Sequence, residues 1–305
     1  MLRFVPPLAC AATLVAGTGS LAEDTVQPDL IEAEFIEDIG ASEHIVYAAK
    51  LRILGQRIPA AACYQHAGIE KEASAELLQD STAEFDKIIE GLKYGDPELG
   101  LMKAETDRKV LADITKVYDF WNPMHEHIDQ IIAQGSTDED IVKLAEEAEP
   151  LLKITNHLVS VISGEYSNPA ELLQADALTL DIAERQAALA QTISKDVCMI
   201  MAGLSAEKSL EEMAEARQLF SVSAQALRHG MPEAGINQTK NPAILEGLDQ
   251  VIGDWESVQS FLDTLAEGEK LSIEDEAHIF GVMNSETTQM DEIELLYNAD
   301  AKLNL

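Results

Sequence analysis

Residues 47–69, "YAAKLRILGQRIPAAACYQHAGI", align without gaps with residues 182–204, "IAERQAALAQTISKDVCMIMAGL". The two segments are about 135 residues apart, and each carries one glutamine and one cysteine at matching positions. Further identities follow in the same order: Phe85/Phe220, Leu92/Leu227, Gly95/Gly230, Pro97/Pro232 and, with a small shift in register, Trp121/Trp255. Self-similarity at a fixed period is the sequence signature of a repeated structural unit. We therefore interpret the chain as a tandem duplication.

Each copy reads as four helices. In the first copy we expect them at about residues 30–66, 70–94, 101–134 and 137–166, and in the second copy the breaks fall at Gly203, between Gly230 and Pro242, and between Gly268 and Ser272. No stretch alternates in polarity for long enough to predict a sheet. The prediction is an all-α fold of two four-helix up-and-down bundles related by internal duplication, with a signal peptide at 1–22, the first bundle at 23–168 and the second at 169–305.

The first 22 residues have the features of an export signal. Arg3 precedes an apolar run that extends to Ala16, and the small residues Ser20 and Ala22 come just before the acidic Glu23. Such an order is typical of a cleavable secretory signal, so we predict cleavage after Ala22 and a periplasmic location. No later stretch is long and apolar enough to span a bilayer, and the mature chain is therefore predicted to have no membrane span.

The composition and the motifs argue against several classes of function. The formal net charge is −34, from 21 basic and 55 acidic residues, and such a charge repels polyanions, so we expect no nucleic-acid partner. The sequence contains no nucleophile elbow, phosphate loop or catalytic cysteine signature. His125 and His127 are two residues apart and would lie on different sides of a helix, whereas zinc-binding helices use a spacing of three or four. We expect neither an enzyme nor a cofactor or metal.

The first helix of each copy has two faces. The apolar stripe predicts the bundle core: Tyr47, Leu51, Leu54, Ile58 and Ala62 in copy one, and Ile182, Leu189, Ile193 and Val197 in copy two. Arg52, Gln56 and Cys63 fall on the opposite face, which also carries alanines and is too apolar for a purely solvated surface. If the two copies pack as a pseudo-twofold pair, Gln56 approaches Gln191 and Cys63 approaches Cys198.

Two local features leave alternatives open. In an oxidising compartment Cys63 and Cys198 either form a disulfide or remain two buried thiols on separate helices. Pro59 clashes with the carbonyl of Gly55 in a regular helix and predicts a kink beside Arg52. Such a kink either opens space for a ligand or simply fits the helix to its bundle.

The stretch "AAKLRILGQRIPAAACY" resembles the helix at the start of the PilJ-type sensor domain, the N-terminal extracytoplasmic module of type IV pilus chemoreceptors. It is also similar to the first helix of NarX-type nitrate sensors. The resemblance implies an all-helical ligand-sensing bundle, in which NarX-like members hold an anion between the equivalent first helices of two subunits. Arg52 would then match the binding arginine, with Gln56 and Arg57 at the Gln-Arg end of the motif. Copy two keeps Arg185 and Gln191 but has Ala187 and Thr192 where further arginines would stand.

Two hypotheses for function follow. The first is a sensor-like module that binds nitrate, nitrite or another small anion between the repeats, through Arg52, Gln56, Arg57, Arg185 and Gln191, and docks onto a membrane receptor or kinase ectodomain. The alternative is a structural or protein-interaction module of the same fold without a ligand, in which Arg52 pairs with a neighbouring carboxylate. The first predicts a guanidinium that is open to a ligand, and the second predicts a dry, filled contact.

Overall fold

The structure is a computed structural model that describes residues 28–166 and 174–303, with side chains for residues 43–166 and 178–300. The predicted signal peptide and the junction at Asn168 and Pro169 lie outside the described residues. Within them the chain forms eight α-helices and no strand: α1 (Pro28–Ala67), α2 (Lys71–Tyr94), α3 (Arg108–Gln134), α4 (Asp138–Tyr166), α5 (Gln174–Ala202), α6 (Ala206–His229), α7 (Pro242–Ala266) and α8 (Ile273–Leu303). The predicted all-α class is confirmed.

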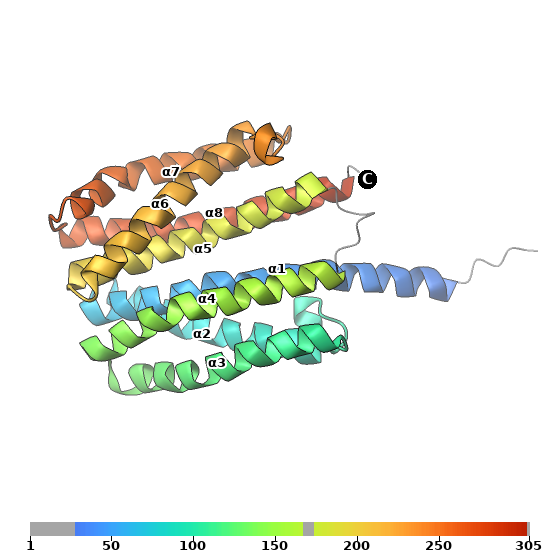
Figure 1. The fold of residues 1–305 in the computed structure, drawn as a ribbon, viewed down its shortest axis with the longest axis horizontal. Helices are drawn as coiled ribbons and strands as arrows, with labels where there is room; N and C mark the ends of the chain where they lie inside the picture. The colour runs from blue at the N-terminus through green and yellow to red at the C-terminus, as the bar shows by residue number, and fades with distance from the viewer. Residues whose placement is uncertain (1–27, 167–173, 304–305) are drawn as a thin grey trace, which may run out of the picture.

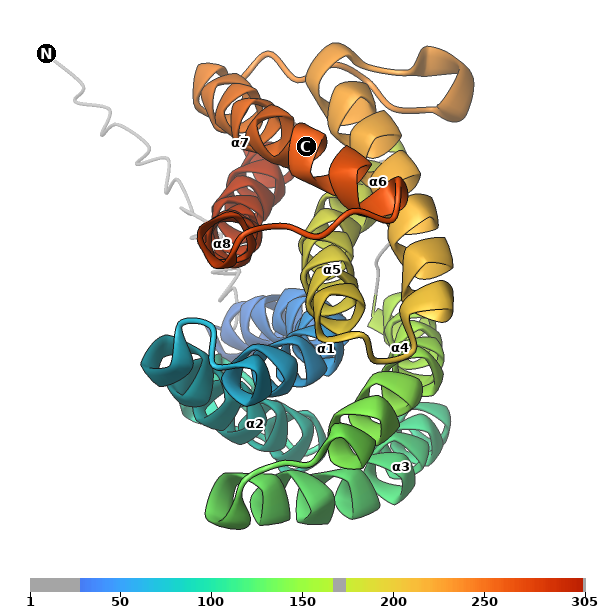
Figure 2. The same ribbon diagram turned by 90° about the vertical axis from the view of Figure 1, so that its left-hand side faces the viewer.

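The helices pack as two bundles of four. Helices α1–α4 form the lower layer in Figure 1, and α5–α8 form the upper one. Within each bundle the first helix packs against the second and the fourth, and α1 also packs along α5. Figure 2 shows the same arrangement from the end of the helices, with α1 and α5 facing each other at the middle. The two first helices therefore form the seam between the bundles.

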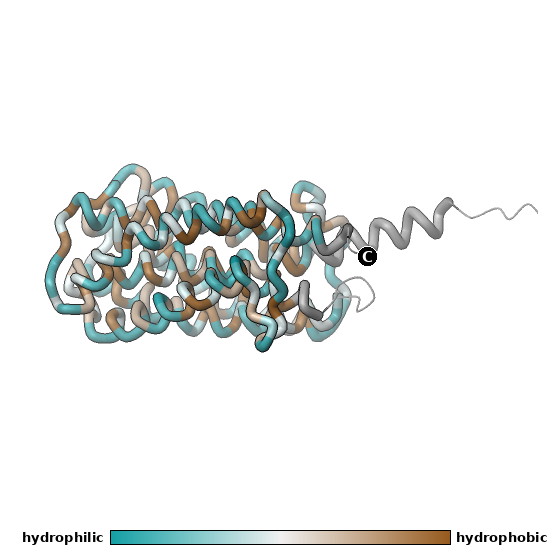
Figure 3. Tube along the Cα trace, turned by 90° about the horizontal axis from the view of Figure 1, so that it is seen from above, coloured by the Kyte–Doolittle hydropathy of each residue, from teal (hydrophilic) through white to brown (hydrophobic). Residues whose placement is uncertain are grey.

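Each bundle has its own hydrophobic core. The predicted apolar stripe of the first helix lies in it, because Leu51, Leu54 and Ile58 are fully buried in the first core, and Ile193 and Val197 are fully buried in the second. Hydrophobic residues recur along every described helix between hydrophilic ones (Figure 3). This distribution is what an amphipathic helix needs to bury one face and leave the other in water.

Backbone features recur at the same spacing as the sequence identities. Helices α2 and α6 each begin after a residue in the left-handed conformation, and each ends at a glycine with φ near +80° that is followed by a short 3₁₀ helix, Pro97–Leu99 or Pro232–Ala234. An isolated bridge closes the turn around each 3₁₀ helix: Asp96 with Leu101, and Met231 with Ile236. These matched turns support the interpretation of a duplication.

The two tryptophans occupy matched places as well. Each packs on a phenylalanine of the second helix of its bundle and donates its indole N–H to the next residue of that helix: Phe85 and Asp86 for Trp121, and Phe220 and Ser221 for Trp255. The indole ring thus fills the core while its polar atom is satisfied at the rim.

The third helix begins later than expected. We predicted a start near residue 101, but α3 begins at Arg108, because Asp96 and Leu101 exchange two backbone hydrogen bonds that close a turn. The carboxylate of Asp107 then accepts hydrogen bonds from the backbone N–H groups of Lys109 and Val110, which is the usual role of an N-cap aspartate. Turn chemistry therefore overrides the helical pattern of residues 101–107.

Helix α1 runs through Pro59 as one helix. Leu151 of α4 packs against Gly55. A Cβ atom at position 55 would lie only 3.2 Å from the Leu151 Cδ2 atom. The glycine thus allows α4 to approach α1 closely. In the described part of the chain, no helix combines the length and the apolarity needed to cross a bilayer.

Substitution of Gly95 tests the turn after α2. Gly95 has φ +82°, and a Cβ atom there would lie 2.9 Å from the backbone carbon of Lys103, whereas Gly135 has φ +85° and nothing within 4 Å of the added atom. Both Gly→Ala variants incur the strain of a glycine-only conformation, about 1–3 kcal/mol. We expect Gly95→Ala to lose more stability than Gly135→Ala in urea denaturation, and equal losses would contradict the close approach.

Candidate functional site

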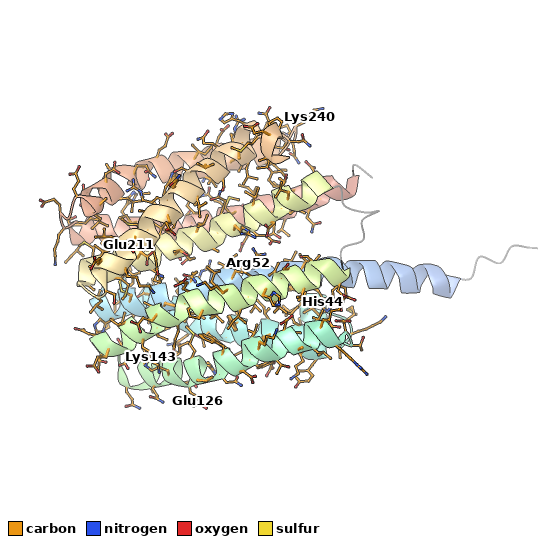
Figure 4. All side chains as sticks on the ribbon, viewed as in Figure 1. His44, Arg52, Glu126, Lys143, Glu211 and Lys240 are labelled. Atoms are coloured by element: carbon orange, nitrogen blue, oxygen red, sulfur yellow. A yellow bond between two sulfur atoms is a disulfide. The ribbon has the colours of Figure 1, made fainter. Side chains whose placement is uncertain are left out.

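The seam between α1 and α5 contains the residues that the sequence analysis placed on the face opposite the core. Figure 4 shows Arg52 between the two layers of helices. Its side chain is only 3% exposed, although it is a charged residue on a helix. A guanidinium that is taken out of water must be compensated by charge and hydrogen bonds. The partners of Arg52 therefore decide what the site can do.

Two carboxylates of α5 hold the Arg52 guanidinium. Its Nη1 atom donates to Asp181 at 3.2 Å and its Nη2 atom donates to Glu184 at 3.2 Å. The Nε–H group is buried without a hydrogen-bond partner. Arg52 thus links the two bundles through ion pairs, and its positive charge faces two acidic groups.

The other predicted arginines do not join Arg52 in one pocket. Arg185 donates from Nε to Asp181 at 2.9 Å, one turn away on its own helix, and its side chain is largely exposed. Arg57 faces two different acids, Asp291 of α8 and Glu84 of α2, and burial lowers its pKa. Asp181 therefore lies between two guanidinium groups, while Arg57 belongs to a neighbouring charged cluster.

The two glutamines make their hydrogen bonds with other groups of the seam. Gln56 donates from Nε2 to the carbonyl of Ala148 on α4 at 3.0 Å, and its Oε1 atom accepts from Thr192 of α5 at 3.3 Å. Gln191 donates from Nε2 to the carbonyl of Met283 and to the Thr287 hydroxyl of α8. Each amide donor is thus directed at the fourth helix of its own bundle, where a main-chain carbonyl accepts its hydrogen bond.

Cys63 and Cys198 form a disulfide in the structure, with their Cα atoms 6.1 Å apart. Both cysteines are fully buried. The bond connects α1 directly to α5, about three turns along α1 from Arg52. The two bundles are therefore joined covalently as well as by ion pairs.

A pair of buried glutamates in the seam was missed by sequence reasoning. Glu184 of α5 and Glu294 of α8 are both buried, and the negative charge of Glu184 raises the pKa of Glu294. Burial raises the pKa of both carboxyl groups, and the charge of Arg52 opposes this shift at Glu184. A signal was present in the sequence, since Glu294 falls on the buried stripe of α8 next to Ile293 and one turn from Met290.

His125 and His127 are directed at different helices. His125 faces Asp86 of α2 at 3.2 Å, and His127 contacts Asp140 of α4 at 2.9 Å. Across residues 43–166 and 178–300, no group of three or more histidine, cysteine, aspartate or glutamate side chains is arranged to hold a metal ion.

Residues 39–146 match the family model described as the type IV pili methyl-accepting chemotaxis transducer N-terminal domain, PilJ. The match covers most of α1, all of α2 and α3, and the start of α4. Residues 39–146 of the first bundle are therefore similar to the PilJ domain, as the resemblance of the first helix predicted. No curated protein matches the chain.

Removal of the Arg52 side chain is expected to destabilise the protein strongly. Arg52→Ala leaves Glu184 buried beside a hole with no cation, and breaking a buried ion pair in this way typically costs about 3–5 kcal/mol. Arg185→Ala is the matched control, because Arg185 contacts the same Asp181 from an exposed position, where ion pairs contribute little. Urea denaturation of both variants measures the difference, and losses of similar size would contradict a compensating role for Arg52.

Proposed function

We propose that this chain is an exported, sensor-type recognition module that acts in the periplasm. The PilJ-type domain in residues 39–146 supports the sensor class. The disulfide between Cys63 and Cys198 supports an extracytoplasmic location, since disulfides persist in oxidising compartments and are rare in the cytosol. The N-terminal sequence with its predicted cleavage after Ala22 supplies the route of export.

The two bundles act as one unit that docks onto a signalling partner, a membrane receptor or a kinase ectodomain. The observation that carries this proposal is that both Nη groups of Arg52 donate hydrogen bonds to carboxylates of the opposite bundle, Asp181 and Glu184. The position where the resemblance implied an anion is thus filled by acidic side chains of the protein itself. A formal charge of −34 favours a partner with a basic surface.

An apolar pair on α6 is a place to look for this partner. Leu219 and Val222 are three residues apart, and their exposed fractions are 56% and 51%. Residues at this spacing lie on the same side of a helix. Large apolar side chains that lie together in water are more common at protein contacts than elsewhere on a surface.

Photo-crosslinking in cells tests the docking proposal. A photoreactive residue in place of Leu219 or Val222 should give one dominant adduct with a receptor or kinase, found in the membrane fraction and identified by mass spectrometry. The control position is Glu126, which is exposed on α3 of the first bundle and should not give this adduct. Adducts of the chain with itself alone, or the same adducts from all three positions, would contradict a docking face on α6.

The small-anion site is a second candidate, and one observation favours it. The Nε–H group of Arg52 is buried and has no hydrogen-bond partner. Burial raises the pKa of Glu184, and protonation of Glu184 would break its ion pair with the Nη2 atom of Arg52. Nitrate or nitrite could replace the Glu184 carboxylate when that group is protonated, because a planar guanidinium binds planar anions in a bidentate manner. The anion would then compete with the protein's own acid.

Thermal unfolding with nitrate and nitrite distinguishes the two candidates. A filled seam predicts no change in Tm for the wild type with either anion. An anion site predicts a rise of several degrees at saturation, since a ligand at one hundred times its Kd contributes about 2.7 kcal/mol. The rise would be larger at mildly acidic pH, would be lost in Arg52→Lys and would be kept in Arg185→Ala. Chloride at the same ionic strength is the control for general salt effects.

A further inference from the structure

Three polar side chains near the disulfide are buried without a hydrogen bond. They are Tyr64 of α1, Ser194 of α5 and Glu276 of α8, and their exposed fractions are 0%, 0% and 4%. The Tyr64 Oη, Ser194 Oγ and Glu276 Oε1 atoms have no hydrogen-bond partner. An unpaired polar group in a protein interior costs stability, and nearly all such groups are paired in native proteins. If the three side chains lie together, one bound group can pair with all of them.

The disulfide places Tyr64 near Ser194. Tyr64 follows Cys63, which is bonded to Cys198 of α5. Ser194 lies one turn before Cys198 on that helix. Helices α1 and α5 run in the same direction (Figure 1). Because side chains on a helix lean toward its N-terminus, the Tyr64 hydroxyl extends from the disulfide toward the level of Ser194.

A ring contact brings α8 to the same place. The ring of Tyr64 packs on the ring of Phe280, with their centroids 4.5 Å apart. Glu276 lies four residues before Phe280 on α8, so these two side chains are neighbours on one face of that helix. Burial raises the pKa of Tyr64, the charge of Glu276 raises it further and the Ser194 hydroxyl lowers it, which agrees with this arrangement. The three unpaired groups thus converge from three helices and from both bundles.

The duplication indicates that the fold does not need polar groups at these positions. At the spacing of 135 residues that separates the two cysteines, each of the three positions has an apolar counterpart in the other copy: Met199 for Tyr64, Pro59 for Ser194 and Ile141 for Glu276. Met199 and Ile141 are both 1% exposed, so apolar side chains fill the matching positions. A buried carboxyl group that the packing does not need is costly to keep, and a bound ligand would offset that cost.

The chemistry of the three groups fits a small ammonium ion. A carboxylate compensates a positive charge, hydroxyl oxygens accept hydrogen bonds from N–H groups, and the aromatic faces of Tyr64 and Phe280 attract cations. Helix α1 ends at Ala67 and α5 at Ala202, and α8 begins at Ile273. The two negative dipole ends outweigh the single positive end and favour a cation. The formal charge of −34 also raises the local concentration of cations.

We propose that Tyr64, Ser194 and Glu276 bind the ammonium group of a small primary amine. The Glu276 carboxylate balances its charge, and the two hydroxyl oxygens accept hydrogen bonds from its N–H groups. The carbon atoms of the amine contact the rings of Tyr64 and Phe280. Residues 272–274, at the start of α8, are exposed, so the site lies within about one helical turn of the surface. This inference does not depend on the docking partner or on the small-anion site.

Saturation-transfer NMR with methylammonium tests the site. The measurement belongs above pH 7, because burial raises the pKa of Glu276 to about 7 and the ionised carboxylate is the form that binds a cation. Irradiation of the aromatic protons of the protein should transfer saturation to the methyl group of methylammonium. Tetramethylammonium has no N–H group to donate and should show little transfer. Added sodium chloride is the control for general salt effects.

Substitutions at the site should weaken the binding in a defined order. Glu276→Gln should raise the Kd for methylammonium at least about tenfold, because it removes the charge that compensates the ammonium group. Tyr64→Phe should cause a smaller loss, since it removes one acceptor and keeps the ring. Glu274→Gln is the matched control, because Glu274 is exposed in the first turn of the same helix. It should leave the Kd unchanged.

Glu276→Ile separates a binding role from a structural one. It introduces the residue type that the first bundle has at the matching position, Ile141, so the variant should fold and should not bind methylammonium. Without the amine its Tm should be at least that of the wild type, because no carboxyl group is left unpaired. Three results would overturn the proposal: no saturation transfer in the wild type, equal binding by the wild type and Glu276→Gln, or a Tm of Glu276→Ile well below that of the wild type.

Discussion

The contact between the bundles depends on the burial of one guanidinium. Arg52 is almost fully removed from water, and an unpaired buried charge is too costly to persist in a folded protein. Asp181 and Glu184 of α5 compensate it, and this requirement fixes how α1 and α5 lie against each other. Glu184 is itself buried, and its carboxylate accepts a hydrogen bond from Arg52. The two helices are therefore held by one guanidinium and the two carboxylates that compensate it.

The two bundles share a backbone plan but differ in the chemistry of their interiors. Turns, tryptophans and buried glutamines recur at a spacing of about 135 residues, and yet the second bundle buries acids where the first has apolar residues. At that spacing the replacements read Ala49 to Glu184, Ala61 to Asp196, Leu151 to Glu286 and Val159 to Glu294. All four acids are buried. A carboxyl group in such a place is costly unless it is paired or protonated, and burial raises the pKa of all four acids.

The family match falls on one bundle. The PilJ match covers residues 39–146, which lie within the first bundle. The first bundle is thus the half for which similarity to the sensor family has been found. The second bundle supplies Asp181 and Glu184, the two carboxylates that bond to the Arg52 guanidinium. We interpret it as the half that compensates the charge of Arg52.

The sequence by itself determined the helical class, the glycine or proline at which most helices end, and the core stripe, because helical periodicity and glycine or proline breaks are local properties of the chain. It also placed Arg52, Gln56 and Cys63 on one face of the first helix, which the structure shows at the seam. Only the tertiary structure decided the partners of these residues. Gln56 turned to the carbonyl of Ala148, and Glu294 approached Glu184 from another helix. Such pairings depend on how helices distant in the sequence pack, and the periodicity of one helix does not specify which polar group will face it.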